Sequence, residues 1–304
     1  MPEGDTIRRL ADRLHRHVSG RTIARSVFRH NRYATRDLAG LRIDVVDAAG
    51  KHLLMRLSAE GRRPITIHSH LRMSGRWSIG LPPRTPPWRR RIELWLPDAK
   101  PLVGIDLPVL DVGPTADEHR WVGHLGPDLC ATSFDGDLAV ANLRAAGSVP
   151  LGGALLDQRN LAGIGNLYAV ELPFMAGVSP WFPSGRVDGL EHLVAVARAL
   201  LPVNAELGPQ TTTGNARRGR THWIYGRRGR PCPRCSTALQ VARESDVPWG
   251  RVTTWCPRCQ PGPDAVDHAH VDPERLRRLV AGHRLVARAL GRSGQHGPRH
   301  SRSG

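Results

Sequence analysis

Lysine is nearly absent from this chain of 304 residues and occurs only at Lys51 and Lys100. Aromatic residues are also scarce, and no apolar run approaches the roughly 20 residues that a membrane-spanning helix needs. The first ten residues, MPEGDTIRRL, are charged and lack the apolar core of a signal peptide. We therefore expect a cytoplasmic globular protein with no membrane segment and very few lysine amines available for chemistry.

Acidic residues are too few to balance the arginines, and the formal net charge is +17. Such an excess is typical of proteins that bind polyanions, because cationic side chains displace the counterions condensed on nucleic acid. A ribosomal or an unrelated basic protein remains compatible with the charge alone. The charge nevertheless favours nucleic acid as the partner.

Cysteine is rare, but four of the five cysteines form two C-x-x-C pairs: Cys232, Cys235, Cys256 and Cys259. Without a secretion signal, such pairs indicate metal ligation rather than disulfides, because each short loop lets two thiolates reach one ion. Four thiolates complete a tetrahedral shell, so we expect one structural Zn²⁺ that holds a small hairpin together. A redox dithiol would need only one pair. Cys130 stands alone and is expected in a core.

The hydrophobic pattern changes character along the chain. Residues 5–18 repeat apolar side chains at helical spacing, and Asp5 or Thr6 can cap this helix. Short alternating segments then predict a β-sandwich. Beyond about residue 125, helices are expected at 136–146, 151–158, 166–176, 186–207 and 272–290. The predicted fold class is therefore α+β.

We expect four segments in this order: a β-sandwich domain (1–125), a helical domain (126–222), a cysteine-bearing finger (223–262) and a C-terminal extension (263–304). In the extension, Asp272 is a plausible N-cap and Pro273 suits the first helical turn. About a dozen residues at the end, rich in Gly, Ser, Arg and His, are expected to be disordered.

The chain begins Met-Pro-Glu, so removal of the initiator methionine would leave Pro2 with the free amine. An α-amino group has a pKa of about 8, against about 10.4 for lysine, so more of it is neutral at pH 7. The positive end of the following helix lowers that pKa further. A neutral amine can attack a sugar carbon, and Glu3 beside it can supply a proton. Taken alone, the tripeptide is also compatible with a terminus that has no function.

Four ordered segments carry a resemblance to a known family: Pro2–Gly4; Gly50–Leu54 with His70–Gly75; Leu156–Gln158 through Ala162–Tyr168; and Tyr225–Arg227 with the four cysteines. Across about residues 2–262 the chain resembles the formamidopyrimidine-DNA glycosylase / endonuclease VIII family. The resemblance implies a DNA repair enzyme that excises oxidised bases and then cuts the strand. It also implies a monomer whose partner is damaged duplex DNA. It leaves open whether single-stranded DNA is a substrate as well.

The resemblance assigns roles to matching residues. Pro2 matches the family nucleophile, Glu3 the general acid, and Lys51 a strand lysine that contacts phosphate at the lesion. Asn166 matches the asparagine of a helix-two-turn-helix motif, which places that motif in the helical domain. Arg251, five residues before Cys256, matches the finger arginine that binds the phosphates flanking the flipped base. A solvated Lys51 or Arg251 and a plain helix-capping Asn166 are the alternatives.

Three further residues are implied near the flipped nucleotide. Met73 stands where the family inserts a side chain into the gap, with Arg72 able to assist, although methionine is also a common core residue. His70 is a plausible phosphate contact. Gly163 and Gly165 are expected to permit the tight turns beside Asn166, where backbone N–H groups grip phosphate.

Departures from the family pattern point to the substrate. Residues 104–110 lack the strand that supplies two more wedge residues in the formamidopyrimidine branch, and residues 211–220 are short for the loop that covers 8-oxoguanine. Both resemble the endonuclease VIII branch and favour oxidised pyrimidines. Asp5 and Thr6 replace the segment that holds the family's second glutamate. An 8-oxoguanine- or formamidopyrimidine-preferring enzyme, a catalytically silent damage-binding paralogue and a zinc-finger transcription regulator are the competing interpretations.

Overall fold

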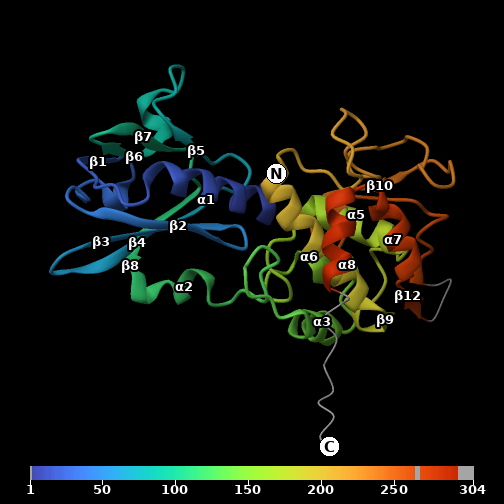
Figure 1. Cartoon of the computed structure of the whole chain (residues 1–304). Coiled ribbons are helices and arrows are strands. Elements are labelled where there is room, and N and C mark those ends of the chain that lie inside the picture. Colours follow the sequence, from blue (N-terminus) through green and yellow to red (C-terminus); the bar gives the residue numbers. More distant parts are fainter. Residues whose placement is uncertain (1, 264–267, 294–304) are drawn as a thin grey trace, which may run out of the picture. The chain divides into compact units, whose positions relative to one another are not determined.

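The computed structural model describes residues 2–263 and 268–293, and it separates into two compact units, residues 1–125 and 126–304 (Figure 1). Most of the terminal stretch for which disorder is predicted lies outside the described residues. No helix in the described ranges is both long and apolar enough to cross a membrane.

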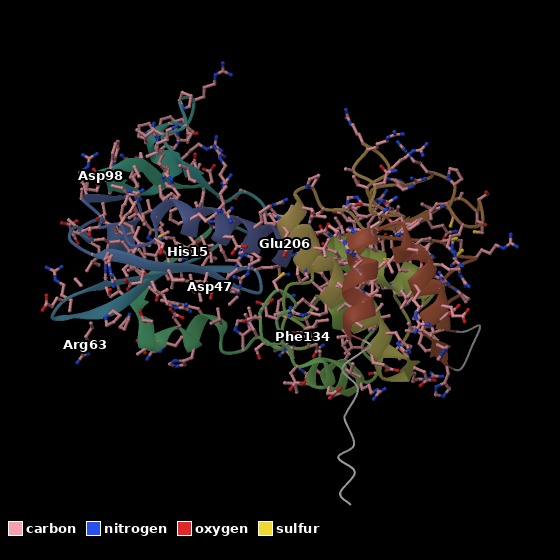
Figure 2. The ribbon with its side chains drawn as sticks, viewed as in Figure 1. His15, Asp47, Arg63, Asp98, Phe134 and Glu206 are labelled. Atoms are coloured by element: carbon pink, nitrogen blue, oxygen red, sulfur yellow. The ribbon has the colours of Figure 1, made fainter. Side chains whose placement is uncertain are left out.

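Unit 1 opens with α1 (Gly4–Val18), as its apolar spacing predicts. Its buried face carries Ile7, Ala11, Leu14 and Val18. Near its start the Arg8 guanidinium donates to Asp47 at 2.8 Å and to the carbonyl of Ala48 at 3.0 Å, which ties α1 to the neighbouring strand β2 (Arg42–Ala49; Figure 2 labels Asp47).

Two four-stranded antiparallel sheets form most of unit 1. The first has the order β1 (Arg25–Phe28), β6 (Arg90–Leu96), β7 (Ala99–Ile105) and β5 (Arg76–Ile79). The second has the order β2 (Arg42–Ala49), β3 (His52–Ala59), β4 (Arg62–His70) and β8 (Val109–Pro114). The short helices of unit 1 are η1 (Asn31–Tyr33), η2 (Pro87–Arg89), η3 (Thr115–Asp117) and α2 (His119–Val122).

A single apolar core joins α1 to both sheets of unit 1. It takes Ile7 from α1, Ile43 and Leu57 from one sheet, and Ile92 and Leu102 from the other. Side chains alternate between the two faces of a strand, so the alternating segments bury one face and expose the other. The predicted β-sandwich and the α+β class are confirmed.

Unit 2 is mainly helical. Its helices are α3 (Gly136–Ala145), α4 (Leu151–Leu156), α5 (Asn166–Ala176), α6 (Leu190–Leu207), α7 (Pro273–Ala281) and α8 (Arg284–Ser293). Its shorter elements are η4 (Ser184–Arg186), η5 (Glu244–Asp246), the parallel pair β9 (Val187–Asp188) and β12 (Ala269–His270), and the antiparallel pair β10 (Gln240–Ala242) and β11 (Thr253–Trp255). All eleven residues of α5 are buried, so it is the central helix of this unit.

Two helical predictions need correction. The helix predicted to start at residue 186 begins at Leu190, because η4 and β9 occupy the residues before it. The segment 272–290 forms two helices, since the chain turns at Gly282 and the N–H of His283 donates to the carbonyl of Val280 at 2.8 Å. Asp272 caps α7 as predicted and accepts two backbone N–H groups at 2.9 and 3.0 Å.

Candidate functional site

Pro2 and Glu3 lie at the amino end of α1. Pro2 is half-buried, whereas Glu3 is only 1% exposed. Glu3 is the N-cap residue, with an extended backbone, and its carbonyl accepts the N–H of Ile7 at 3.0 Å. The Pro2 nitrogen therefore lies just before the positive end of the α1 helix dipole.

The first turn of α1 also buries Asp5. Its Oδ1 accepts the backbone N–H of Thr6 at 2.6 Å and the Thr6 hydroxyl at 3.2 Å. The prediction that Asp5 or Thr6 caps the helix is wrong, because the helix already begins at Gly4 with Glu3 as its cap. Two buried carboxyl groups, those of Glu3 and Asp5, thus lie within one turn of Pro2.

Lys51 lies in the tight turn that joins β2 to β3. Gly50 has a φ of +55°, a left-handed conformation that glycine adopts without strain. The turn lies near the start of α1, because Arg8 hydrogen-bonds the carbonyl of Ala48, three residues before Lys51. The positive charge of Lys51 also helps to lower the pKa of His70.

Four histidines gather beside this turn, and three of them were not anticipated. The Nδ1 of His52 lies 2.8 Å from the Nε2 of His68, and the Nδ1 of His68 lies 3.5 Å from Asp111. The His52 ring meets His70 and His124 edge-on, with centroids 4.9 and 6.1 Å apart. Burial, followed by the neighbouring positive groups, lowers the pKa of His52 to about 3 and that of His70 to about 4. Both rings are therefore neutral near pH 7.

The turn after β4 presents Met73 to solvent. Its side chain is 69% exposed, so the interpretation of Met73 as a core residue is wrong. The preceding residue, Arg72, is also exposed and has a φ of +46°. The backbone N–H of Arg72 donates to the Nδ1 of His70 at 3.1 Å, which leaves the proton of a neutral His70 on Nε2. His70 thus holds the turn that projects Arg72 and Met73.

In unit 2, Asn166 is the first residue of α5. Its Nδ2 donates to the carbonyl of Val252 at 2.9 Å, whereas its buried Oδ1 finds no hydrogen-bond partner among the described residues. Gly163 has a φ of +106° and requires glycine, but Gly165 has a φ of −119°. A positive-φ turn therefore occurs at the first of the two predicted glycines only.

Arg251 lies beside the residue that Asn166 binds. Its guanidinium is about half exposed and lies 3.4 Å from the carboxylate of Glu244. Asn166 at the start of α5 hydrogen-bonds Val252, which directly follows Arg251 and precedes β11. The structure therefore places the two predicted phosphate-binding residues of unit 2 in one neighbourhood.

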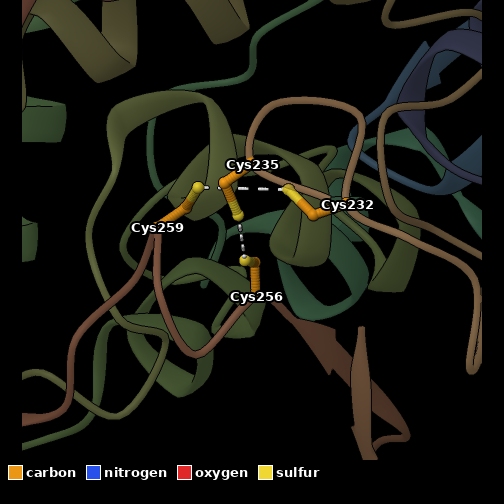
Figure 3. A group of neighbouring side chains, drawn as sticks. All are labelled: Cys232, Cys235, Cys256 and Cys259. Atoms are coloured by element: carbon orange, nitrogen blue, oxygen red, sulfur yellow. Dashed lines mark hydrogen bonds between the residues drawn. The ribbon is translucent and has the colours of Figure 1, made fainter. Parts of the chain in front are cut away.

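The four paired cysteines converge, as Figure 3 shows, with all four sulfur atoms within 4.8 Å of one another. Two of the Sγ–Sγ distances are 3.9 Å (Cys232–Cys259) and 3.4 Å (Cys235–Cys256). Sulfurs bound tetrahedrally at about 2.3 Å from one ion would be about 3.8 Å apart, so the cluster fits a metal ion. Cys130 is half-buried at the edge of the unit 2 core rather than inside it.

Glu171 of α5 is a central residue that the sequence reasoning missed. It is fully buried, and its two oxygens accept the backbone N–H groups of Trp223, Ile224 and Tyr225, each at 2.7 Å. It also accepts the hydroxyl of Thr212. One carboxylate therefore fixes both ends of the loop that precedes the finger. A single acidic residue within an otherwise apolar helix was the available signal.

Residues 1–107 match the formamidopyrimidine-DNA glycosylase N-terminal domain family. The chain is 48% identical over 269 residues to the probable endonuclease 8 2 of Streptomyces coelicolor, with 86% of this chain and 95% of the relative covered. It is 42% identical over 260 residues to the DNA-(apurinic or apyrimidinic site) lyase Nei2 of Mycolicibacterium smegmatis, with 86% and 99% covered.

The solved structure of the MutM (Fpg) protein from Thermus thermophilus aligns with a TM-score of 0.69 and 30% identity, covering 86% of this chain and 99% of that one. Coverage of 86% leaves about 43 of the 304 residues unmatched, close to the length of the extension 263–304. The chain therefore belongs to the formamidopyrimidine-DNA glycosylase / endonuclease VIII family and stands on the endonuclease VIII side of it.

Proposed function

We propose that this protein is a bifunctional DNA glycosylase and abasic-site lyase of base excision repair. It removes an oxidised base from damaged DNA and then nicks the strand. The observation that carries the proposal is the nearly full-length likeness to relatives named endonuclease 8 and abasic-site lyase. The buried Glu3 next to Pro2 at a helix start supplies the matching chemistry.

Pro2 is the proposed nucleophile once the initiator methionine is removed. Its nitrogen bonds to C1′ of the damaged nucleotide, the base leaves with the electron pair of the glycosidic bond, and Glu3 donates a proton to the ring oxygen as the sugar opens. The resulting iminium acidifies the C2′ proton. Loss of that proton expels the 3′ phosphate, and a second elimination at the other side of the sugar expels the 5′ phosphate.

In unit 1, Lys51 and His70 are the proposed contacts to phosphate at the lesion. The ammonium of Lys51 and the Nε2–H of a neutral His70 are both donors suited to phosphate oxygens. The exposed Met73, assisted by Arg72, fills the gap that the flipped nucleotide leaves. An apolar wedge there offsets part of the stacking that flipping removes.

In unit 2, Asn166 and Arg251 are the proposed grips on the DNA backbone. The Nδ2 of Asn166 supports this role, because it is a donor suited to a phosphate oxygen and already donates to the carbonyl of Val252 beside Arg251. We assign residues 126–222 to a helix-two-turn-helix domain, 223–262 to the finger and 263–304 to an added extension. In a cell the enzyme acts in the cytoplasm, on the nucleoid, as a monomer.

Oxidised pyrimidines are the proposed bases. The stretch 104–110, which would have to supply further wedge residues, buries Leu107 and Leu110 instead. Asp106 turns the chain there with a φ of +49° and pairs with Arg89. The exposed Met73 turn is therefore left to fill the gap, as expected for the endonuclease VIII branch.

We assign one structural Zn²⁺ to the four cysteines. Burial raises the pKa of the Cys256 thiol, and a bound cation offsets that cost by favouring the thiolate. All four positions of a tetrahedral ion would be taken by cysteine, so the ion would order the finger and take no part in bond breaking.

Borohydride trapping tests the proposal. The purified protein is mixed with a duplex that carries thymine glycol or an abasic site, and reduction of the iminium should leave a covalent protein–DNA adduct. A chain whose terminal amine is blocked should give no adduct, and mass spectrometry should show that the active wild-type chain begins at Pro2. Binding without nicking would indicate a damage sensor, whereas faster release of 8-oxoguanine than of pyrimidine lesions would indicate the other branch.

A further inference from the structure

The C-terminal extension packs onto the helical core of unit 2. Helix α7 packs on α5 and helix α8 on α6. Leu276, Val280 and Val286 are at most 1% exposed, so both helices bury their apolar faces. Helices α7 and α8 of the extension are therefore an integral part of unit 2.

Arg275 anchors α7 to the end of α5. Its Nη2 donates to the carbonyl of Phe174 at 2.6 Å, which also accepts the backbone N–H of Gly177 at 3.1 Å. A Cβ at Gly177 would lie only 1.7 Å from the Nη1 of Arg275. The absence of a side chain at Gly177, where φ is +79°, thus makes room for the guanidinium.

The turn between α7 and α8 touches a loop that is distant in the sequence. A Cβ at Gly214 would lie 2.6 Å from the Cα of His283 and 2.7 Å from the carbonyl oxygen of Gly282. The loop backbone therefore rests directly on this turn. His283 is only 4% exposed, so the contact is closed to water.

The same loop, residues 211–221, is fixed at its base by the core. The side chain of Asn204 exchanges two hydrogen bonds with the backbone of Thr211, at 3.0 and 3.1 Å. The hydroxyl of Thr212 donates to Glu171, and the backbone N–H of Thr212 donates to the carbonyl of Thr221 at 2.9 Å. The base is thus held by α5 and α6, while the Gly282–His283 turn supports the middle.

The tip of the loop is strongly basic. Arg217, Arg218 and Arg220 are exposed, and none of them forms an ion pair with the described residues. Arg227, at the base of the finger, donates to the carbonyl of Gly219 at 3.4 Å. The tip is therefore joined to the arginines that lead into the finger, and together they form one cationic surface.

We propose that the C-terminal extension is a brace that holds the 211–221 loop so that Arg217, Arg218 and Arg220 bind phosphates of the DNA backbone. The DNA-binding part rests on the function proposed above, whereas the brace itself does not. Backbone phosphate is the ligand because three adjacent unpaired guanidinium groups on an ordered loop suit repeated monoanionic groups. Such contacts add affinity without reading the base.

Two glycines of the same loop give a matched pair of variants. Gly214→Ala and Gly219→Ala impose the same left-handed strain, since the φ values are +75° and +78°. The Cβ at Gly214 collides with the brace, whereas nothing lies within 4 Å of the one at Gly219. Any difference between the two variants therefore reports the contact rather than the backbone conformation.

Limited trypsin digestion of the full chain tests, without DNA, whether the extension supports the 211–221 loop. Cleavage after Arg217 and Arg218 should be roughly fivefold or more faster in Gly214→Ala than in Gly219→Ala, because local opening controls access. Cleavage after Arg84, in an exposed loop of unit 1, serves as the internal reference. His283→Ala, compared with the exposed Arg277→Ala, repeats the test from the other side of the contact. Equal rates within both pairs would overturn the brace.

The phosphate contacts are tested by measuring, as a function of salt concentration, the affinity for a duplex that carries a tetrahydrofuran abasic analogue. Gly214→Ala should weaken binding and lower the slope of log K against log salt by about one for each lost contact, whereas Gly219→Ala should not. In a background of Arg217→Ala, Arg218→Ala and Arg220→Ala, adding Gly214→Ala should change binding little. Faster cleavage with an unchanged slope would overturn the phosphate role. Failure of the wild type to bind this duplex would count against the proposed function and leave the digestion result standing.

Discussion

Glu171→Gln should strongly destabilise unit 2, although it changes one group in a helix interior. The carboxylate accepts three backbone N–H groups at 2.7 Å and one hydroxyl, and it is fully buried. Glutamine keeps one acceptor oxygen and turns an NH₂ toward the other donors. An unsatisfied buried N–H costs about 1–3 kcal/mol, and each remaining bond loses about 1 kcal/mol when its acceptor is no longer charged. One unsatisfied N–H and two weakened bonds give an expected loss of about 3–5 kcal/mol.

Differential scanning calorimetry, which can resolve separate domain transitions, is the suitable assay. For a unit of this size the loss corresponds to a fall of roughly 6–20 °C in the melting temperature. Glu191→Gln on α6 is the control, because that carboxylate is exposed and its ion pair with Arg144 is worth at most about 1 kcal/mol. If Glu171→Gln melts within about 1 °C of this control, the buried carboxylate does not hold the loop as argued.

Three other predictions concern unit 1 and the finger. Met73→Ala should slow excision from duplex DNA roughly tenfold in a nicking assay, with little change in melting temperature because the side chain is exposed. Since burial holds the pKa of His52 at about 3 and that of His70 at about 4, the unfolded chain binds protons first as the pH falls below 6.5. The free energy of unfolding, measured with urea, should therefore fall as the pH is lowered from about 6.5 to 4. His52→Gln should reduce the slope of this free energy against pH by about 1.4 kcal/mol per pH unit. Withdrawing metal with a chelator should release one zinc equivalent per chain and expose the finger to protease, and release of none would contradict the assignment.

The sequence was sufficient to predict those features that depend only on residues close together in the chain. The buried positions of α1 follow its 3.6-residue period, and the four cysteines converge because each C-x-x-C loop already brings two thiols together. The N-cap of α7 was also readable, since Asp272 directly precedes a proline in the first turn.

Contacts between distant segments could not be read in the same way. His68 and His70 share one face of β4, but their partners depend on strand register, which sets His70 opposite His52 and His68 opposite Asp111. The break between α7 and α8 was not predicted, because apolar residues keep their helical spacing on both sides of Gly282. A glycine inside a helical pattern is often tolerated, so the break becomes certain only from the turn that docks on the loop.

Helix α5 explains why the functional residues of unit 2 depend on one another. Its first residue, Asn166, donates to the carbonyl of Val252 just before β11. Its middle residue, Glu171, accepts the hydroxyl of Thr212 near the start of the 211–221 loop and backbone N–H groups of residues 223–225 just after it. Arg275 donates to a carbonyl of its last turn. Because the whole helix is buried, it cannot tilt at one end without moving the others. Loosening the loop should therefore also disturb the finger, and Arg275 of α7 should stabilise both by fixing the last turn of α5.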